Sequence, residues 1–168
     1  MEVSVEAIKA LREETGAGVM DCKRALEQSE GDLAKAHEIL KDIGAASAAK
    51  KASRATNEGI VESYIHSGGR IGVLLEVNCE TDFVARTPEF RELAHSLAMQ
   101  VAAMAPLHVD CDDLREDETE EIPQEACLMQ QAFIRDPTKT IQDLVKEAVG
   151  KLGENIRVRR FIRFSLGE

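Results

Sequence analysis

The residues Ile71-Gly72-Val73-Leu74-Leu75-Glu76-Val77-Asn78-Cys79 carry the clearest periodicity in this chain of 168 residues. An apolar side chain recurs at every odd position, which predicts a β-strand with one wholly apolar face. Residues 59–66 precede this strand and are joined to it by Ser67-Gly68-Gly69-Arg70, a sequence suited to a hairpin turn. Residues 156–166 predict another strand, with arginines on one face. Its apolar face includes Val158, Ile162 and Phe164.

Helices are predicted between these strands. Thr87-Pro88 suits the start of a helix, because threonine can cap it and proline fits its first turn. Thr140 and Asp143 form a sequence typical of a capping box, and the helix that they begin ends at Gly153. The buried stripe of the first helix comprises Phe90, Leu93, Leu97, Val101 and Met104.

The segment between these two helices has weaker signals. Residues 110–121 contain eight acidic residues and indicate a solvated loop or helix edge. A short helix is expected after Pro123, carrying Leu128 and Met129, and Asp136-Pro137 is expected to form a turn. The order of elements after residue 57 predicts a small antiparallel sheet packed with helices, an α+β architecture.

The N-terminal residues predict three short helices. Val5, Ile8 and Leu11 lie at helical spacing, and Gly16-Ala17-Gly18 interrupts that spacing before a second helix begins. A third helix is expected to start at Gly31-Asp32 and to stop at Gly44. We therefore predict a three-helix module over 1–44, a connecting helix or linker over the Ala-rich residues 45–56, and an α+β domain over 57–168.

Composition excludes several classes of protein. The chain has 31 acidic and 21 basic residues, a net charge of −10, so phosphate backbones repel it and direct nucleic-acid binding is not expected. It shows neither a signal peptide nor an apolar run long enough to cross a membrane, which predicts a cytoplasmic protein. Four cysteines without a CxxC pair or metal-like spacing predict free thiols in a reducing compartment.

Motifs of catalysis are missing from the sequence. It contains no Gly-rich phosphate loop, no HExxH and no GxSxG, and it nominates no nucleophile, cofactor site or metal site. The pattern therefore favours a binding role over an enzyme. Thr81-Asp82-Phe83-Val84 stands out, because it lies between a regular strand and a regular helix. Hydrophobicity alone favours a buried Phe83, whereas an exposed phenylalanine on a loop would indicate a protein-contact site.

Three stretches resemble the bacterial elongation factor Ts family. The run from Leu11 to Leu26 (LREETGAGVMDCKRAL) is similar to the N-terminal signature of that family. Residues 65–74 (IHSGGRIGVL) and 76–85 (EVNCETDFVA) are similar to its second signature, and Gly153-Glu154-Asn155-Ile156 resembles its C-terminal end. The motifs are long, occur in the family's order and reach both ends of the chain.

The resemblance implies an N-terminal module related to ubiquitin-associated domains and a core that binds elongation factor Tu, both GDP-bound and nucleotide-free. In the family, the segment that matches Thr81, Asp82, Phe83 and Val84 enters near the magnesium ion of the Tu GTPase. Dislodging that ion weakens GDP binding and so promotes exchange for GTP during translation elongation. Lys9, Val19 and Met20 would contact the GTPase domain, although Val19 could instead belong to the core of the bundle.

Departures from the family pattern leave other roles open. The segment after Pro123 is shorter than usual, Ala132 replaces a common proline, and Val19 replaces a common methionine. The chain has only one core where longer relatives have two related halves, so self-association as a homodimer would supply the missing half. The alternatives are an adaptor whose bundle binds ubiquitin-like or extended peptide ligands, and a protein that binds Tu without promoting exchange.

Overall fold

The N-terminal residues form a three-helix bundle, as predicted. The computed structural model describes residues 3–114 and 122–168. Helices α1 (Val5–Thr15) and α2 (Val19–Gln28) are joined by a turn in which Gly16 adopts a left-handed conformation and ends α1. The relation of the bundle to ubiquitin-associated domains stays a prediction. Its core consists of Leu11, Cys22, Ala25, Leu26, Ala36 and Leu40.

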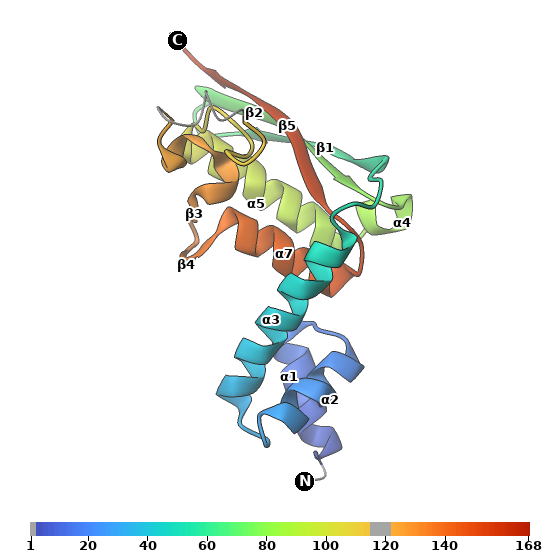
Figure 1. The fold of residues 1–168 in the computed structure, drawn as a ribbon. Coiled ribbons are helices and arrows are strands. Elements are labelled where there is room, and N and C mark those ends of the chain that lie inside the picture. The colour runs from blue at the N-terminus through green and yellow to red at the C-terminus, as the bar shows by residue number, and fades with distance from the viewer. Residues whose placement is uncertain (1–2, 115–121) are drawn as a thin grey trace.

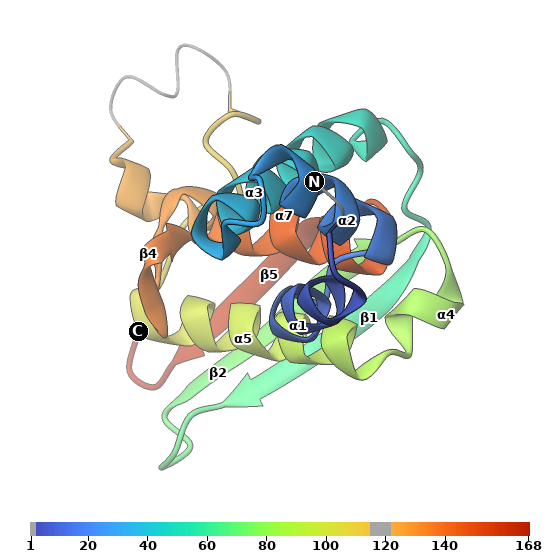
Figure 2. The ribbon, with the colours of Figure 1, turned by 90° about the horizontal axis from the view of Figure 1, so that it is seen from below.

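Helix α3 (Leu33–Lys51) does not stop at Gly44, contrary to the prediction. Glycine ends a helix when it takes a positive φ, and Gly44 is not among the glycines that do so. A Cβ added to Gly150 of α7 (Ile141–Leu152) would lie 3.4 Å from the Cα of Gly44. The two glycines therefore let α3 pass close to α7 (Figure 2). Residues 45–51 continue α3, and the domain limits at 44 and 57 remain predictions.

A three-stranded antiparallel sheet forms the centre of the remaining chain. Its strands β1 (Glu58–Ile65), β2 (Ile71–Cys79) and β5 (Arg157–Ser165) lie in the order β1-β2-β5. The predicted hairpin joins β1 to β2, and the amide of His66 donates to the carbonyl of Ile71 at 2.9 Å. Figure 1 shows α5 (Pro88–Met104) and α7 on one side of this sheet. Among the described helices, none covers the opposite face.

The faces of β5 differ from the prediction. Val77 pairs with Val158, but Glu76 pairs with Arg160, so Arg159 is an extra residue that forms a β-bulge. Beyond a bulge the alternation of side chains shifts by one, and residues that pair across strands share a face. Phe161 therefore packs against the core, whereas Ile162 and Phe164, expected to be buried, are 50% and 65% exposed.

The segment between α5 and α7 is also only partly as expected. Two short 3-10 turns, Gln124–Ala126 and Leu128–Gln130, replace the predicted helix after Pro123. The two-residue strand β3 (Ala132–Phe133) pairs with β4 (Asp136–Thr140), so Asp136-Pro137 lies in a strand and the turn falls at residues 134–135. Proline is tolerated there because a two-stranded ribbon consists only of edges. The predicted capping box of α7 is confirmed.

A disulfide joins Cys111 to Cys127, which contradicts the prediction of four free thiols. An isolated parallel bridge between His108 and Cys127 places the two segments side by side and their cysteine Cα atoms 5.6 Å apart. Such a pairing between distant segments leaves no spacing signal in the sequence. Cys22 and Cys79 are free, as predicted, and both are buried. The predicted acidic loop, residues 110–121, lies outside the described residues from position 115 onward.

Candidate functional site

The segment singled out in the sequence forms a single helical turn rather than an open loop. Helix α4 (Asp82–Ala85) follows β2 and precedes α5, and the hydroxyl of Thr81 accepts a hydrogen bond from the amide of Val84 at 3.4 Å. The Cys79 thiol donates to the Thr81 carbonyl at 3.1 Å. Burial raises the pKa of Cys79 to about 11, so the thiol stays protonated and keeps this hydrogen bond at neutral pH.

Phe83 projects into solvent from this turn. Its side chain is 79% exposed, so the expectation from hydrophobicity alone was wrong and the expectation from the resemblance was right about exposure. A single turn directs only part of its residues inward. Val84 packs on the core and Ala85 is buried, and these two side chains occupy the inward positions. Phe83 is therefore a large, exposed apolar side chain on a turn whose other side packs against the core.

Asp82 lies at the start of α4 and forms an ion pair with Arg86 at 2.9 Å. Both side chains are well exposed, at 45% and 73%, so the pair contributes little to stability. The carboxylate of Asp82 is therefore available to a partner at little cost.

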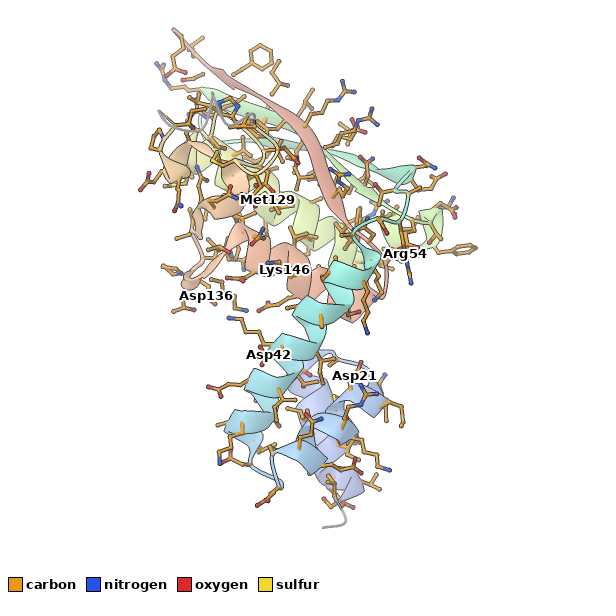
Figure 3. The ribbon with its side chains drawn as sticks, in the orientation of Figure 1. Asp21, Asp42, Arg54, Met129, Asp136 and Lys146 are labelled. Atoms are coloured by element: carbon orange, nitrogen blue, oxygen red, sulfur yellow. A yellow bond between two sulfur atoms is a disulfide. The ribbon has the colours of Figure 1, made fainter. Side chains whose placement is uncertain are left out.

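A network of hydrogen bonds holds the base of the turn. The carboxylate of Glu154, which follows α7, accepts from the amide of Thr81 at 3.0 Å and from its hydroxyl at 2.6 Å. In return, the carboxylate of Glu80 accepts from the amide of Asn155 at 2.7 Å. The guanidinium of Arg54 also donates to the Glu80 carboxylate at 3.4 Å, and Arg54 lies close to the end of α3 (Figure 3).

Glu154 and Asn155 lie within the C-terminal motif of the sequence, which by itself does not reveal their role. One signal could have found Glu154, because it directly follows Gly153, the residue that ends α7. A carboxylate is unfavourable beside the negative end of a helix dipole, so an acid at this position needs another partner to stabilise it.

The other predicted contact residues lie on the N-terminal bundle. Lys9 is exposed and lies 3.9 Å from Glu13 in a weak surface ion pair. Val19 and Met20 are 49% and 66% exposed at the start of α2, so Val19 is not a core residue of the bundle. In Figure 1, α2 and α4 both lie to the right of α3. No hydrogen bond or ion pair between described residues joins Lys9, Val19 or Met20 to residues 81–84.

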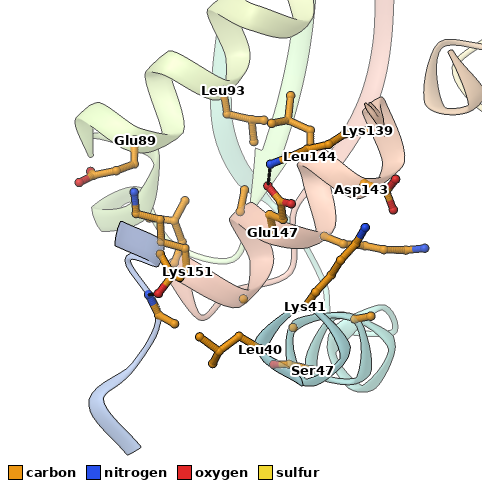
Figure 4. A pocket seen from close by; sticks show the side chains of 18 of the residues that line it. Leu40, Lys41, Ser47, Glu89, Leu93, Lys139, Asp143, Leu144, Glu147 and Lys151 are labelled. Carbon is orange, nitrogen blue, oxygen red and sulfur yellow. Dashed lines mark hydrogen bonds and ion pairs between the residues drawn. The ribbon is translucent and has the colours of Figure 1, made fainter. Parts of the chain in front are cut away.

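A cavity of about 710 Å³ lies between the bundle and the core. Figure 4 shows its lining from α3, α5 and α7, with Lys139 paired to Glu147 at 2.8 Å. Lys151 crosses to the bundle, where its Cε lies 2.6 Å from the position of a Cβ added to Gly16. Charges of both signs line the cavity, and two of the oppositely charged pairs, Lys139–Glu147 and His37–Glu14, lie within ion-pair distance. The lining therefore does not favour one class of small ligand.

Metal and membrane sites have little support in the described part of the chain. Residues 3–114 and 122–168 contain no group of three or more His, Cys, Asp or Glu side chains placed to hold a metal ion. No described helix combines the length and the apolar character needed to cross a bilayer.

Comparison with known proteins covers the whole chain. The family model described as Elongation factor TS matches residues 9–123 and 118–168. Elongation factor Ts of Thermotoga neapolitana is 52% identical over 195 aligned positions, which cover 100% of this chain and 99% of the relative.

The chain belongs to the elongation factor Ts family.

Other members of the Ts family agree with this assignment. The Ts protein of Thermotoga maritima is 50% identical, with 100% of this chain and 98% of the relative covered. That of Carboxydothermus hydrogenoformans is 47% identical, with 99% and 90% covered.

The alignment also bears on the shortened core. It runs over 195 positions, 27 more than the 168 residues of this chain, so residues of the Thermotoga Ts protein have no counterpart here. The two matches to the Ts family model meet at residues 118–123. This supports a location of the missing segment close to Pro123, where the sequence indicated it.

Proposed function

We propose that this chain is a guanine-nucleotide exchange factor for elongation factor Tu, and that Phe83 and Asp82 carry the exchange. Membership of the Ts family supports the partner. The exposure of Phe83 on a braced turn is the observation that supports the site. The Phe83 side chain is 79% exposed, and aromatic residues are enriched at the buried centres of protein interfaces.

Exchange of this kind needs no catalytic residue. The magnesium ion of a GTPase bridges the nucleotide phosphates, so a side chain that displaces the ion or its ligands weakens GDP binding. Phe83 would act as the wedge in Tu, and Asp82 would offer a carboxylate beside it. A protein that binds nucleotide-free Tu more tightly than Tu·GDP must weaken the affinity of Tu for GDP by the same ratio, because the two binding equilibria are linked.

The N-terminal bundle would supply a second contact with Tu. Met20 and Val19 form an exposed apolar pair at the start of α2, and Lys9 adds an exposed positive charge on α1. Methionine adapts its shape to a partner surface, which suits a contact that must hold Tu in more than one nucleotide state. In this proposal the bundle holds Tu while α4 disturbs its nucleotide site.

The experiment is release of a fluorescent GDP analogue from Tu by the full chain and by Asp82→Ala/Phe83→Ala. We expect the double variant to lose most of the acceleration and to keep the parent's thermal unfolding curve. Leu107→Ala is the matched control, because Leu107 is also exposed, at 75%, and lies outside the site. An unchanged rate in the double variant would refute the role of the turn. Stable Tu binding by the parent without faster release would identify a protein that binds Tu only.

We further propose that the chain forms a homodimer through the uncovered face of the sheet. The bulge at Arg159 turns Ile162 and Phe164 toward that face, where they join other exposed apolar residues. A second copy would present the same surface, and a two-fold interface is self-complementary. The exposed apolar residues of these strands and the following turn are Val61, Ile65, Leu74, Ile162, Phe164 and Leu166.

Light scattering of the purified chain tests the dimer. We expect twice the chain mass for the parent at micromolar concentration and a single chain mass for Phe164→Glu, because a carboxylate would have to be buried at the interface. Exchange on Tu can be followed in the same samples. A monomeric parent at high concentration would exclude this interface, and the site on α4 would be unaffected by that result.

A further inference from the structure

The end of β2 leaves two successive backbone amides that no strand pairs. They belong to Glu80 and Thr81, and both donate to one carboxylate oxygen of Glu154, at 3.1 Å and 3.0 Å. The other oxygen of Glu154 accepts from the Thr81 hydroxyl at 2.6 Å. Hydrogen bonds to a charged acceptor are shorter and stronger than neutral ones. Glu154 therefore fixes both the backbone and the side chain of the residue that caps α4.

The neighbouring residue ties the same point to the end of α3. The side-chain amide of Asn155 donates to the carbonyls of Ala52 and Arg54, at 3.2 Å and 2.9 Å. Its backbone amide donates to the Glu80 carboxylate at 2.7 Å. Asn155 is 4% exposed, so these partners satisfy its backbone N–H and its side-chain NH₂ group in place of water.

Glu154 occupies a position that helix electrostatics disfavours. It follows Gly153, whose left-handed conformation ends α7, and so lies beside the negative end of that helix. Stability of α7 alone would favour a lysine or a neutral residue at this point. The three hydrogen bonds to Glu80 and Thr81 offset that repulsion, and they serve the turn that carries Phe83 rather than the helix.

We propose that Glu154 and Asn155 are positioning residues that lock the Phe83 turn to the end of α3, and hence to the bundle. This inference rests on the exchange function proposed above. Phe83 can displace groups in Tu only if the turn that carries it keeps its position. Thr81, which Glu154 holds through its backbone and its side chain, is two residues from Phe83. The lock makes the distance between Phe83 and the bundle a fixed property of the free protein. Tu then meets both contacts already in place, and its binding energy is not spent on ordering them.

The test compares Glu154→Ala, Glu154→Gln and Asp143→Ala in full-length protein. Asp143 caps the opposite end of α7, so Asp143→Ala destabilises the same helix without touching the turn. In Glu154→Gln, the side-chain oxygen can still accept from the amides of Glu80 and Thr81, and the new NH₂ group can donate to the Thr81 hydroxyl. Release of a fluorescent GDP analogue, measured over a range of Tu·GDP concentrations, yields kcat and KM.

We expect Glu154→Ala to lower kcat/KM about tenfold, because Tu must then spend binding energy on ordering the turn and because a misplaced Phe83 lowers the rate of release. Glu154→Gln should stay within about threefold of the parent, because two of the three hydrogen bonds can persist. Amide hydrogen exchange at residues 80 and 81 should be at least about tenfold faster in Glu154→Ala, as expected for local opening. Asp143→Ala should change none of these values.

Other outcomes overturn the proposal in distinguishable ways. If Phe83→Ala slows exchange and Glu154→Ala does not, the lock has no role in positioning. Equal losses in Glu154→Ala and Asp143→Ala would mean that both act only through stability. If Phe83→Ala itself exchanges at the parent rate, the proposed function of the turn fails and the positioning role fails with it.

Discussion

The two phenylalanines of β5 provide the sharpest test of the fold. Phe161 packs against the core from beyond the bulge, whereas Phe164 is 65% exposed. Replacing a fully buried phenylalanine by alanine lowers the free energy of unfolding by about 3–5 kcal/mol. Because Phe161 is only partly buried, we expect Phe161→Ala to lower the free energy of unfolding by about 2 kcal/mol. Phe164→Ala should change it by less than about 0.5 kcal/mol in the monomer, as surface substitutions do.

Urea unfolding followed by far-UV circular dichroism measures both changes. With a slope of about 2 kcal/mol per molar urea, the Phe161→Ala midpoint should fall by about 1 M. Its melting temperature should fall by about 4–8 °C, the shift expected for a domain of this size. Measurements extrapolated to low protein concentration remove any stabilisation that comes from self-association. A larger loss in Phe164→Ala than in Phe161→Ala would refute the bulge at Arg159 and restore simple alternation along β5.

Three further predictions follow from the cysteines and from the cap of α7. Denatured without reductant, the chain should titrate two thiols, and four after reduction of Cys111–Cys127; four in both states would contradict the disulfide. Burial raises the pKa of Cys79 to about 11, so the contribution of its protonated thiol to stability is complete below about pH 9 and is lost as the pH rises toward 11. Thermal unfolding at a series of pH values should show this loss of stability at alkaline pH, and the loss should be smaller in Cys79→Ala. The hydrogen bond from the Thr140 backbone amide lowers the pKa of Asp143, so the contribution of its carboxylate to stability is complete above about pH 4 and decreases in acid. In urea unfolding, Asp143→Ala should lower the free energy of unfolding by about 1 kcal/mol at pH 7 and by less at pH 2.

Local patterns predicted most of the elements because their causes are local. The hairpin at residues 67–70 and the start of α5 at Thr87-Pro88 depend on residues a few positions apart, and both are confirmed. The capping box of Thr140 and Asp143 is confirmed for the same reason. In each case the deciding hydrogen bonds or dihedral preferences lie within one turn of chain.

The errors arose where a distant segment changed the outcome. Gly44 failed to end α3 because the helix gains contact with Gly150, about a hundred residues later in the chain. The sequence of β5 alternates, but pairing with β2 inserts a bulge at Arg159 that exchanges its faces. Cys111 and Cys127 meet through pairing of two irregular segments.

The candidate site shows the same division. Sequence alone determined the order of helices and strands, the position of residues 81–84 between a strand and a helix, and membership of the Ts family through its motifs. Tertiary structure decided that Phe83 faces solvent, that Asn155 reaches the end of α3 and that Glu154 braces the turn. The physical reason is that exposure and hydrogen bonding between α3, α4 and α7 depend on how separate elements pack. Periodicity in one element carries no information about its neighbours in space.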